Sequence, residues 1–112
     1  MKNESTEDRI IQLQKMLHAS PNDVFLAYAL GLEYQKRIDH LKAISCFELA
    51  LSIDTHYLAA YYQKAISQVE TNQISHALET LEEGISDATK QGDSKTLAEM
   101  KNFKMNLLLE LD

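Results

Sequence analysis

The sequence contains a pattern of small and large residues that returns, in a weaker form, about 34 residues later. The first copy consists of Leu30, Gly31, Tyr34, Ala43, Phe47 and Ala50. The equivalent positions of the second copy hold Lys64, Ala65, Gln68, Ala77, Leu81 and Gly84. We call the separation from Gly31 to Ala65 the repeat spacing. Self-similarity with this period predicts stacked pairs of helices, none of which can bury its apolar face alone.

The remaining composition favours an all-helical chain, because 112 residues contain only one proline and three glycines. The predicted divisions are an N-terminal helix at 5–20, helix pairs at 22–55 and 56–90, and a C-terminal helix at 93–111. Pro21 ends the first helix, since the residue before a proline is pushed out of the helical region. Asn72 is expected to stop one helix in a left-handed conformation, and Gly92 is expected to end the next. About six helices joined by short connections must form antiparallel neighbours within one domain, residues 1–112.

The repeated residues also predict where the helices touch. Two helices approach to about 8–10 Å only where small side chains meet at the crossing. Gly31 on one helix, with Ala43 and Ala50 on the next, meets this requirement, while Tyr34 and Phe47 fill the space on either side.

These residues resemble the tetratricopeptide repeat family, whose pattern has a large aromatic residue, then Leu-Gly, Tyr, Ala, Phe, Ala and a closing proline. The resemblance covers nearly the whole chain and is greatest to small stand-alone bacterial members. It implies a short right-handed α–α superhelix, in which residues 5–20 form the second half of a truncated repeat and 93–111 a capping helix. The chain departs from the pattern at Ala27, Thr55, Lys64 and Gln68.

Charge and cysteine content limit the compartment and the class of partner. The net charge is −6, from 11 basic and 17 acidic residues, and no basic stripe exists, which argues against nucleic acid. No apolar run approaches the roughly 20 residues that cross a bilayer, and no secretory signal is visible. The single cysteine, Cys46, forms no internal disulfide. We therefore expect a cytoplasmic protein with no membrane contact.

The side chains that could carry chemistry are scattered. His18, His40, His56 and His76 fall on different helices or helix ends without the spacing of a metal site. Cys46, beside Phe47, is read as a small apolar side chain, because nothing in its sequence context lowers its pKa. No glycine-rich phosphate loop occurs. We expect no cofactor, no metal and no enzymatic activity.

The resemblance implies a concave groove lined by the first helix of each pair, where family members bind other proteins. One row of residues at helical spacing would face this groove: Phe25, Tyr28, Leu32, Gln35, Lys36, Tyr62, Ile66 and Val69. Either flanking helices cover the row, or it binds an extended peptide or an amphipathic helix. Members that grip a C-terminal carboxylate use Lys and Asn here, so the tyrosines argue against such a clamp.

The last predicted helix has more apolar residues than a capping helix needs. Its main stripe is formed by Leu97, Met100, Phe103, Leu107 and Leu111. Met105, Leu108 and Leu109 widen that stripe, either as incidental surface residues or as a contact with a second copy in a homodimer. The sequence thus predicts non-catalytic binding of another protein or peptide. The alternative is a structural subunit that uses its apolar surfaces for homo-oligomerisation or for assembly into a larger complex.

Overall fold

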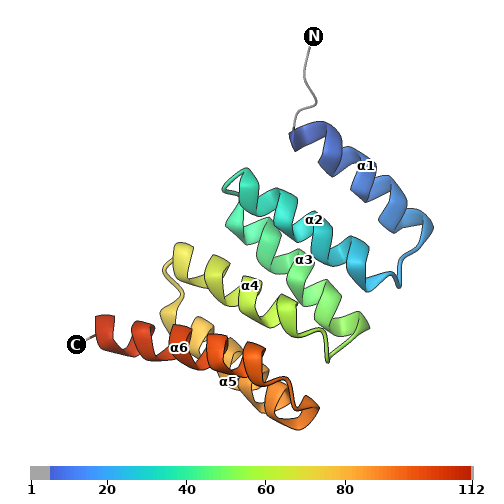
Figure 1. Ribbon diagram of the computed structural model, residues 1–112. Coiled ribbons are helices and arrows are strands. Elements are labelled where there is room, and N and C mark those ends of the chain that lie inside the picture. The colour runs from blue at the N-terminus through green and yellow to red at the C-terminus, as the bar shows by residue number, and fades with distance from the viewer. Residues whose placement is uncertain (1–5, 112) are drawn as a thin grey trace.

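The computed structural model describes residues 6–111, which form six α-helices joined by short turns (Figure 1). Their bounds are α1 Thr6–Ala19, α2 Val24–Lys36, α3 His40–Ile53, α4 Leu58–Glu70, α5 Ile74–Gln91 and α6 Ser94–Glu110. These helices lie within a few residues of the predicted ones, although the predicted start at Ser5 falls outside the described residues. The all-α fold with about six helices is confirmed.

The helices follow one another through space in chain order, so that α1 lies at one end of the stack and the α5–α6 pair at the other (Figure 1). The stack is elongated, with extents of 47 × 29 × 20 Å. Its radius of gyration of 14.8 Å exceeds the roughly 13 Å of a compact domain of this length. A stack two repeats long therefore exposes a large part of each end helix.

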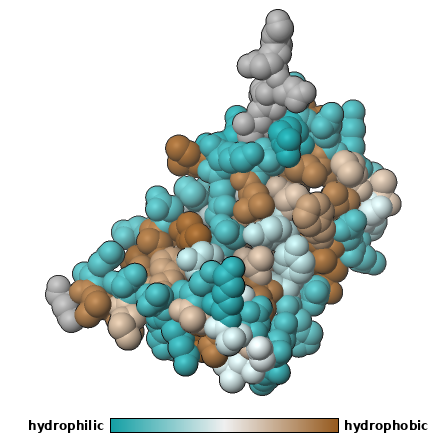
Figure 2. Space-filling model, viewed as in Figure 1, coloured by the Kyte–Doolittle hydropathy of each residue, from teal (hydrophilic) through white to brown (hydrophobic). Residues whose placement is uncertain are grey.

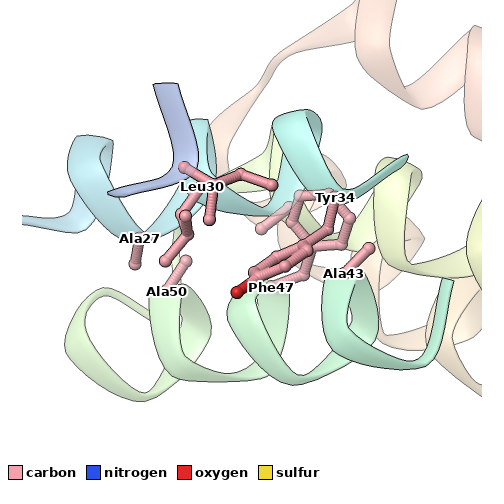
Figure 3. Close-up of a cluster of buried hydrophobic side chains, with 8 residues drawn as sticks. Ala27, Leu30, Tyr34, Ala43, Phe47 and Ala50 are labelled. Atoms are coloured by element: carbon pink, nitrogen blue, oxygen red, sulfur yellow. The ribbon is translucent and has the colours of Figure 1, made fainter. Parts of the chain in front are cut away.

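Helices α2 and α3 pack closely where Gly31 meets the ring of Phe47. Figure 3 shows this ring on α3 between Ala43 and Ala50, beneath Leu30 and Tyr34 of α2. A Cβ built on Gly31 would overlap the ring of Phe47, and this ring is completely buried. Ala43 and Ala50 on α3 are also fully buried beside Phe47. The predicted contact of Gly31 with small residues is not what the structure shows, because the side-chain atoms nearest to Gly31 all belong to the large ring of Phe47. A side chain at position 31 would have to displace this ring.

A second cluster occupies the equivalent place between α4, α5 and α6. Gly84 lies against Tyr61 and Met100, so that a Cβ there would come within 2.9 Å of the Tyr61 Cβ. Leu81 replaces the larger Phe47 and is fully buried, as is Ala65, which replaces Gly31. The smaller side chain of Leu81 on α5 is therefore compensated by the larger side chain of Ala65 on α4.

Two departures from the family pattern are matched by new polar partners. Lys64, in place of Leu, is half-buried and its Nζ lies 3.5 Å from the Glu48 carboxylate. Gln68, in place of Tyr, is buried, and its Oε1 accepts a 2.7 Å hydrogen bond from the Thr80 hydroxyl. Because a buried amide is costly without a partner, the pairing with Thr80 makes Gln68 tolerable in the core.

The turn between α3 and α4 is held without the closing proline that Thr55 replaces. Asp54 Oδ1 accepts a 2.9 Å hydrogen bond from the His56 amide. The Tyr61 hydroxyl donates to the Thr55 carbonyl over 2.9 Å, and Gln91 Nε2 donates to the His56 carbonyl over the same distance. These side chains fix a turn whose backbone a proline would otherwise restrict.

Three turns of the described chain contain a residue in the left-handed conformation. One is Gly92, and the other two occupy equivalent places in the two repeats. Asn72 has φ 62°, as predicted, and Ile38 has φ 61°. Asparagine tolerates this conformation, whereas a β-branched side chain is strained in it. Ile38 is also exposed, so burial does not compensate for the strain.

Cys46 lies on α3 and packs against the first cluster. Burial raises the pKa of its thiol to about 11, and the nearby Asp39 carboxylate adds to the rise. At neutral pH the thiol is therefore protonated, and a thiolate nucleophile is not available there.

We predict that Gly31→Ala lowers the free energy of unfolding by about 1–3 kcal/mol, because overlap with Phe47 outweighs the gain in helix propensity of about 1 kcal/mol. In a Phe47→Leu background the same change should cost less by at least about 1 kcal/mol, since Ala65 and Leu81 already form such a pair. Urea denaturation of the four proteins measures the coupling. Equal costs in both backgrounds would contradict the contact.

We predict that Ile38→Asn raises the free energy of unfolding by about 1 kcal/mol, because asparagine is less strained at positive φ. The reciprocal change Asn72→Ile should lower it by a similar amount. Thermal denaturation of both variants tests the pair, and two shifts of the same sign would refute the explanation.

We predict that Cys46 reacts with a disulfide reagent at pH 8 about 100-fold more slowly than an exposed cysteine of pKa about 8.5, because only about one thiol in 1,000 is ionised. Asp39→Asn should accelerate the reaction, since it removes the negative charge but preserves a residue that can cap α3. Absorbance of the released reagent gives both rates. A rate equal to that of a model thiol would disprove burial of Cys46.

Candidate functional site

The predicted binding row lies on the side of the stack formed by the first helix of each pair, α2 and α4, and continued by α6. We call this surface the first-helix face. Phe25 is the most open apolar member of the row, with 60% of its surface exposed. The other apolar members of the row are half-buried: Tyr28, Leu32, Tyr62, Ile66 and Val69. The row is thus neither covered nor fully open.

The two tyrosines of the row pack on neighbouring aromatic rings. The ring centroid of Tyr28 lies 5.7 Å from that of Phe47 and 5.2 Å from that of Tyr57. Tyr62 lies 5.4 Å from Phe103 of α6. Burial raises the pKa of the Tyr28 phenol, and Tyr57 raises it further, while a hydrogen bond with Gln63 opposes the rise. Each tyrosine presents one flank to solvent from a fixed position.

Two polar members of the row have structural partners. Gln35 Nε2 donates to the Gln63 carbonyl over 3.2 Å and to the Ser67 hydroxyl over 2.9 Å, which joins α2 to α4. Lys36 is exposed and its Nζ lies 3.3 Å from the buried carboxylate of Glu33. Gln35 therefore holds the repeats together, and Lys36 is the member of this pair that faces solvent.

A groove of about 270 Å³ lies between α4 and α6 on the first-helix face. Its walls are formed by Ala59, Tyr62, Gln63, Thr96 and Glu99. Of these, Tyr62 belongs to the predicted row, and so does Ala59, which follows Phe25 by one repeat spacing on the neighbouring helix. The repeat spacing does not identify Thr96 or Glu99.

The repeat spacing does not predict equivalent residues on α6, because the last helical hairpin is longer than the one before it. Helix α5 has 18 residues against 14 in α3, and α6 has 17 against 13 in α4. Each of the two helices is four residues longer and the connection is two residues shorter. Residues of α6 therefore lie six positions later in the sequence than the repeat spacing alone would place them. The ion pairs show the shift directly. Glu48 binds Lys64, whereas Glu82, which takes the place of Glu48 in the next repeat, binds Lys104.

A larger hollow of about 400 Å³ lies elsewhere, between α5 and the α3–α4 turn. Three of its lining side chains are acidic: Glu82, Glu83 and Asp87. Asp87 is held by His56 Nδ1 at 2.9 Å and by Gln91 Nε2 at 2.8 Å. Carboxylates at this hollow raise the pKa of Tyr61 further after burial. These contacts fix the turn to α5, and we assign the hollow no other role.

Within residues 6–111 no helix is long and apolar enough to cross a membrane. The same described part of the chain contains no group of three histidine, cysteine or acidic side chains placed to hold a metal ion.

Sequence comparison finds no matching family model and no matching curated protein. Structural comparison gives three informative matches. The TPR2B domain of yeast Sti1, in its complex with pHsp70, aligns with a TM-score of 0.86 at 18% identity and covers 94% of this chain and 84% of that one. A Salinibacter ruber tetratricopeptide repeat domain protein aligns at 29% identity, with a TM-score of 0.73 and coverage of 78% and 88%.

The third match, BPP2914 from Bordetella parapertussis, has a TM-score of 0.80 at 23% identity and covers 97% of this chain and 91% of its own. It is similar in extent to the chain described here, so the likeness spans nearly the whole of both molecules. Helix order, the Gly31–Phe47 contact and these matches agree. The chain is a small protein with the tetratricopeptide repeat fold, as its sequence resemblance predicted.

Proposed function

We propose that this protein is a non-catalytic interaction module that binds a peptide or a helix of another protein across the first-helix face. The α4–α6 groove carries the proposal, because it places a half-buried aromatic ring, Tyr62, in a hollow about 270 Å³ in volume. Phe25, exposed on α2, extends the apolar surface beyond the groove. Aromatic side chains held by rigid neighbours are frequent anchors at protein interfaces.

The charge of the groove indicates the chemistry of the partner. Glu99 is the one acidic side chain among the described lining residues of the groove, beside the amide of Gln63 and the hydroxyl of Thr96. A carboxylate at the rim of an apolar site favours a cation nearby. We therefore expect the partner to insert an apolar side chain next to a lysine or arginine.

The structural matches support a protein partner, since the similar Sti1 domain is seen in a complex with pHsp70. An identity of 18% is too low to assign the same partner to this chain. The tyrosines of the predicted row also differ from the Lys and Asn of a carboxylate clamp. A reducing, cytoplasmic location is part of the same proposal, because the chain has one cysteine and no disulfide.

The proposal is tested by selecting displayed random peptides on the purified protein and measuring the affinity of an enriched peptide by fluorescence anisotropy. We predict that Phe25→Glu weakens binding about tenfold or more, because it puts a charge into the apolar surface. Glu99→Lys should reduce the preference for a basic residue in the peptide.

The matched control is Leu41→Glu on α3, whose side chain is 64% exposed and lies away from the first-helix face. It should bind the peptide like the wild type. Selection that enriches no peptide, or affinity unchanged by both Phe25→Glu and Glu99→Lys, would reject the proposed site.

A further inference from the structure

The helix at each end of the stack lacks the partner with which it would form a complete repeat. Helix α1 precedes α3 by one repeat spacing and has the same length of 14 residues, so it corresponds to the second helix of a pair. Helix α6 corresponds to α4, the first helix of a pair, with Lys104 in the place of Lys64. One end of the molecule therefore presents an unpaired second helix and the other an unpaired first helix.

The shift of α6 identifies the residues that would face its missing partner. Met105 takes the place of Gly31 and Ala65, and Leu108 takes the place of Tyr34 and Gln68. Those four residues are buried, whereas Met105 is 59% and Leu108 45% exposed. In both repeats a second helix covers these two positions. On α6 the same positions hold apolar side chains that are exposed to solvent.

These two residues border a surface cavity of about 330 Å³, which continues onto Ile85 of α5 and the aliphatic chains of Lys101 and Lys104. Figure 2 shows hydrophobic surface reaching solvent near the C-terminal end of the chain. The cavity has the place that a second helix of a third repeat would fill.

The free flank of α1 contains the corresponding residues. Met16 precedes Ala50 by one repeat spacing, and Leu13 precedes Phe47 by the same interval. Ala50 and Phe47 are fully buried against α2, but Met16 is 53% exposed. Leu13 packs on the first cluster with part of its side chain and leaves the rest exposed. The flank of α1 that faces α2 is already occupied, since Ile10 is buried in the first cluster. Arg9, which precedes Ala43 by one repeat spacing, lies one turn before Leu13 and pairs with Glu33 of α2 at 3.1 Å.

We infer that copies of this chain associate head to tail, with the α1 face of one copy (Leu13 and Met16) packing on the α6 face of the next (Met105 and Leu108). The pair α6–α1 would complete a repeat and continue the stack from copy to copy. Such a contact joins two different surfaces and does not close, so that it produces chains of increasing length.

The association is concentration-dependent and weak, for two reasons visible in the sequence. Met105 is much larger than Gly31, so α6 and α1 cannot approach as closely as α2 and α3 do. Each copy also carries a net charge of −6, which opposes association at low salt. Raising the salt concentration should therefore strengthen it.

The test uses two variants, each with one end disabled. In Met16→Glu the α6 face remains intact, and in Leu108→Glu the α1 face remains intact. Sedimentation velocity should show wild-type species larger than a dimer as concentration rises, and a monomer for each variant alone. An equimolar mixture of the two variants should form a 1:1 dimer and nothing larger. Circular dichroism shows that both variants are folded.

Ile11→Glu is the matched control, because Ile11 is 44% exposed on another face of α1. This variant should associate like the wild type. Phe25→Glu should also leave association unchanged, which separates this inference from peptide binding on the first-helix face. A wild-type monomer up to about 1 mM, dimerisation of Met16→Glu alone, or a mixture that stays monomeric would each overturn the head-to-tail contact.

Discussion

The close approach of α2 and α3 at Gly31 determines much of the remaining structure. Because a backbone with no side chain lies against the ring of Phe47, the two helices pack tightly and their remaining apolar flanks point away from each other. Those flanks are the surfaces on which α1 and α4 pack. A wider separation at Gly31 would change the angle at which every later helix is added. The stacking direction follows from this contact and from its counterpart in the second repeat, where Ala65 and Leu81 are both fully buried.

The second repeat shows that this constraint concerns volume rather than residue type. Glycine and phenylalanine in the first pair become alanine and leucine in the second, and Ala50 becomes Gly84, which faces the larger Tyr61. Few residues are identical between the two units, yet the helices take equivalent positions. Within each helix pair a small side chain lies opposite a large one. The two repeats therefore share a pattern of side-chain sizes although few of their residues are identical.

Most of the fold was predictable from these sizes together with the turn residues, because both act locally. The cores around Phe47 and Leu81 and the left-handed Asn72 were predicted in this way. Ile38 was not, since an isoleucine gives no signal for positive φ. The groove residues Thr96 and Glu99 were missed for a different reason. The longer last hairpin moves α6 out of the repeat spacing, and only the ion pair from Glu82 to Lys104 reveals its alignment.

In so short a stack, the helices at the two ends have as much influence on the exposed surface as the contacts between the repeats. Two complete repeats supply one interior seam, which is closed by Gln35, Ser67 and their neighbours. Helices α1 and α6 are each covered on one side only, and they present methionine and leucine where the repeats have buried residues. A longer array would bury the same positions inside its own chain. In this molecule, burial of these apolar positions on α1 and α6 requires a surface from another chain.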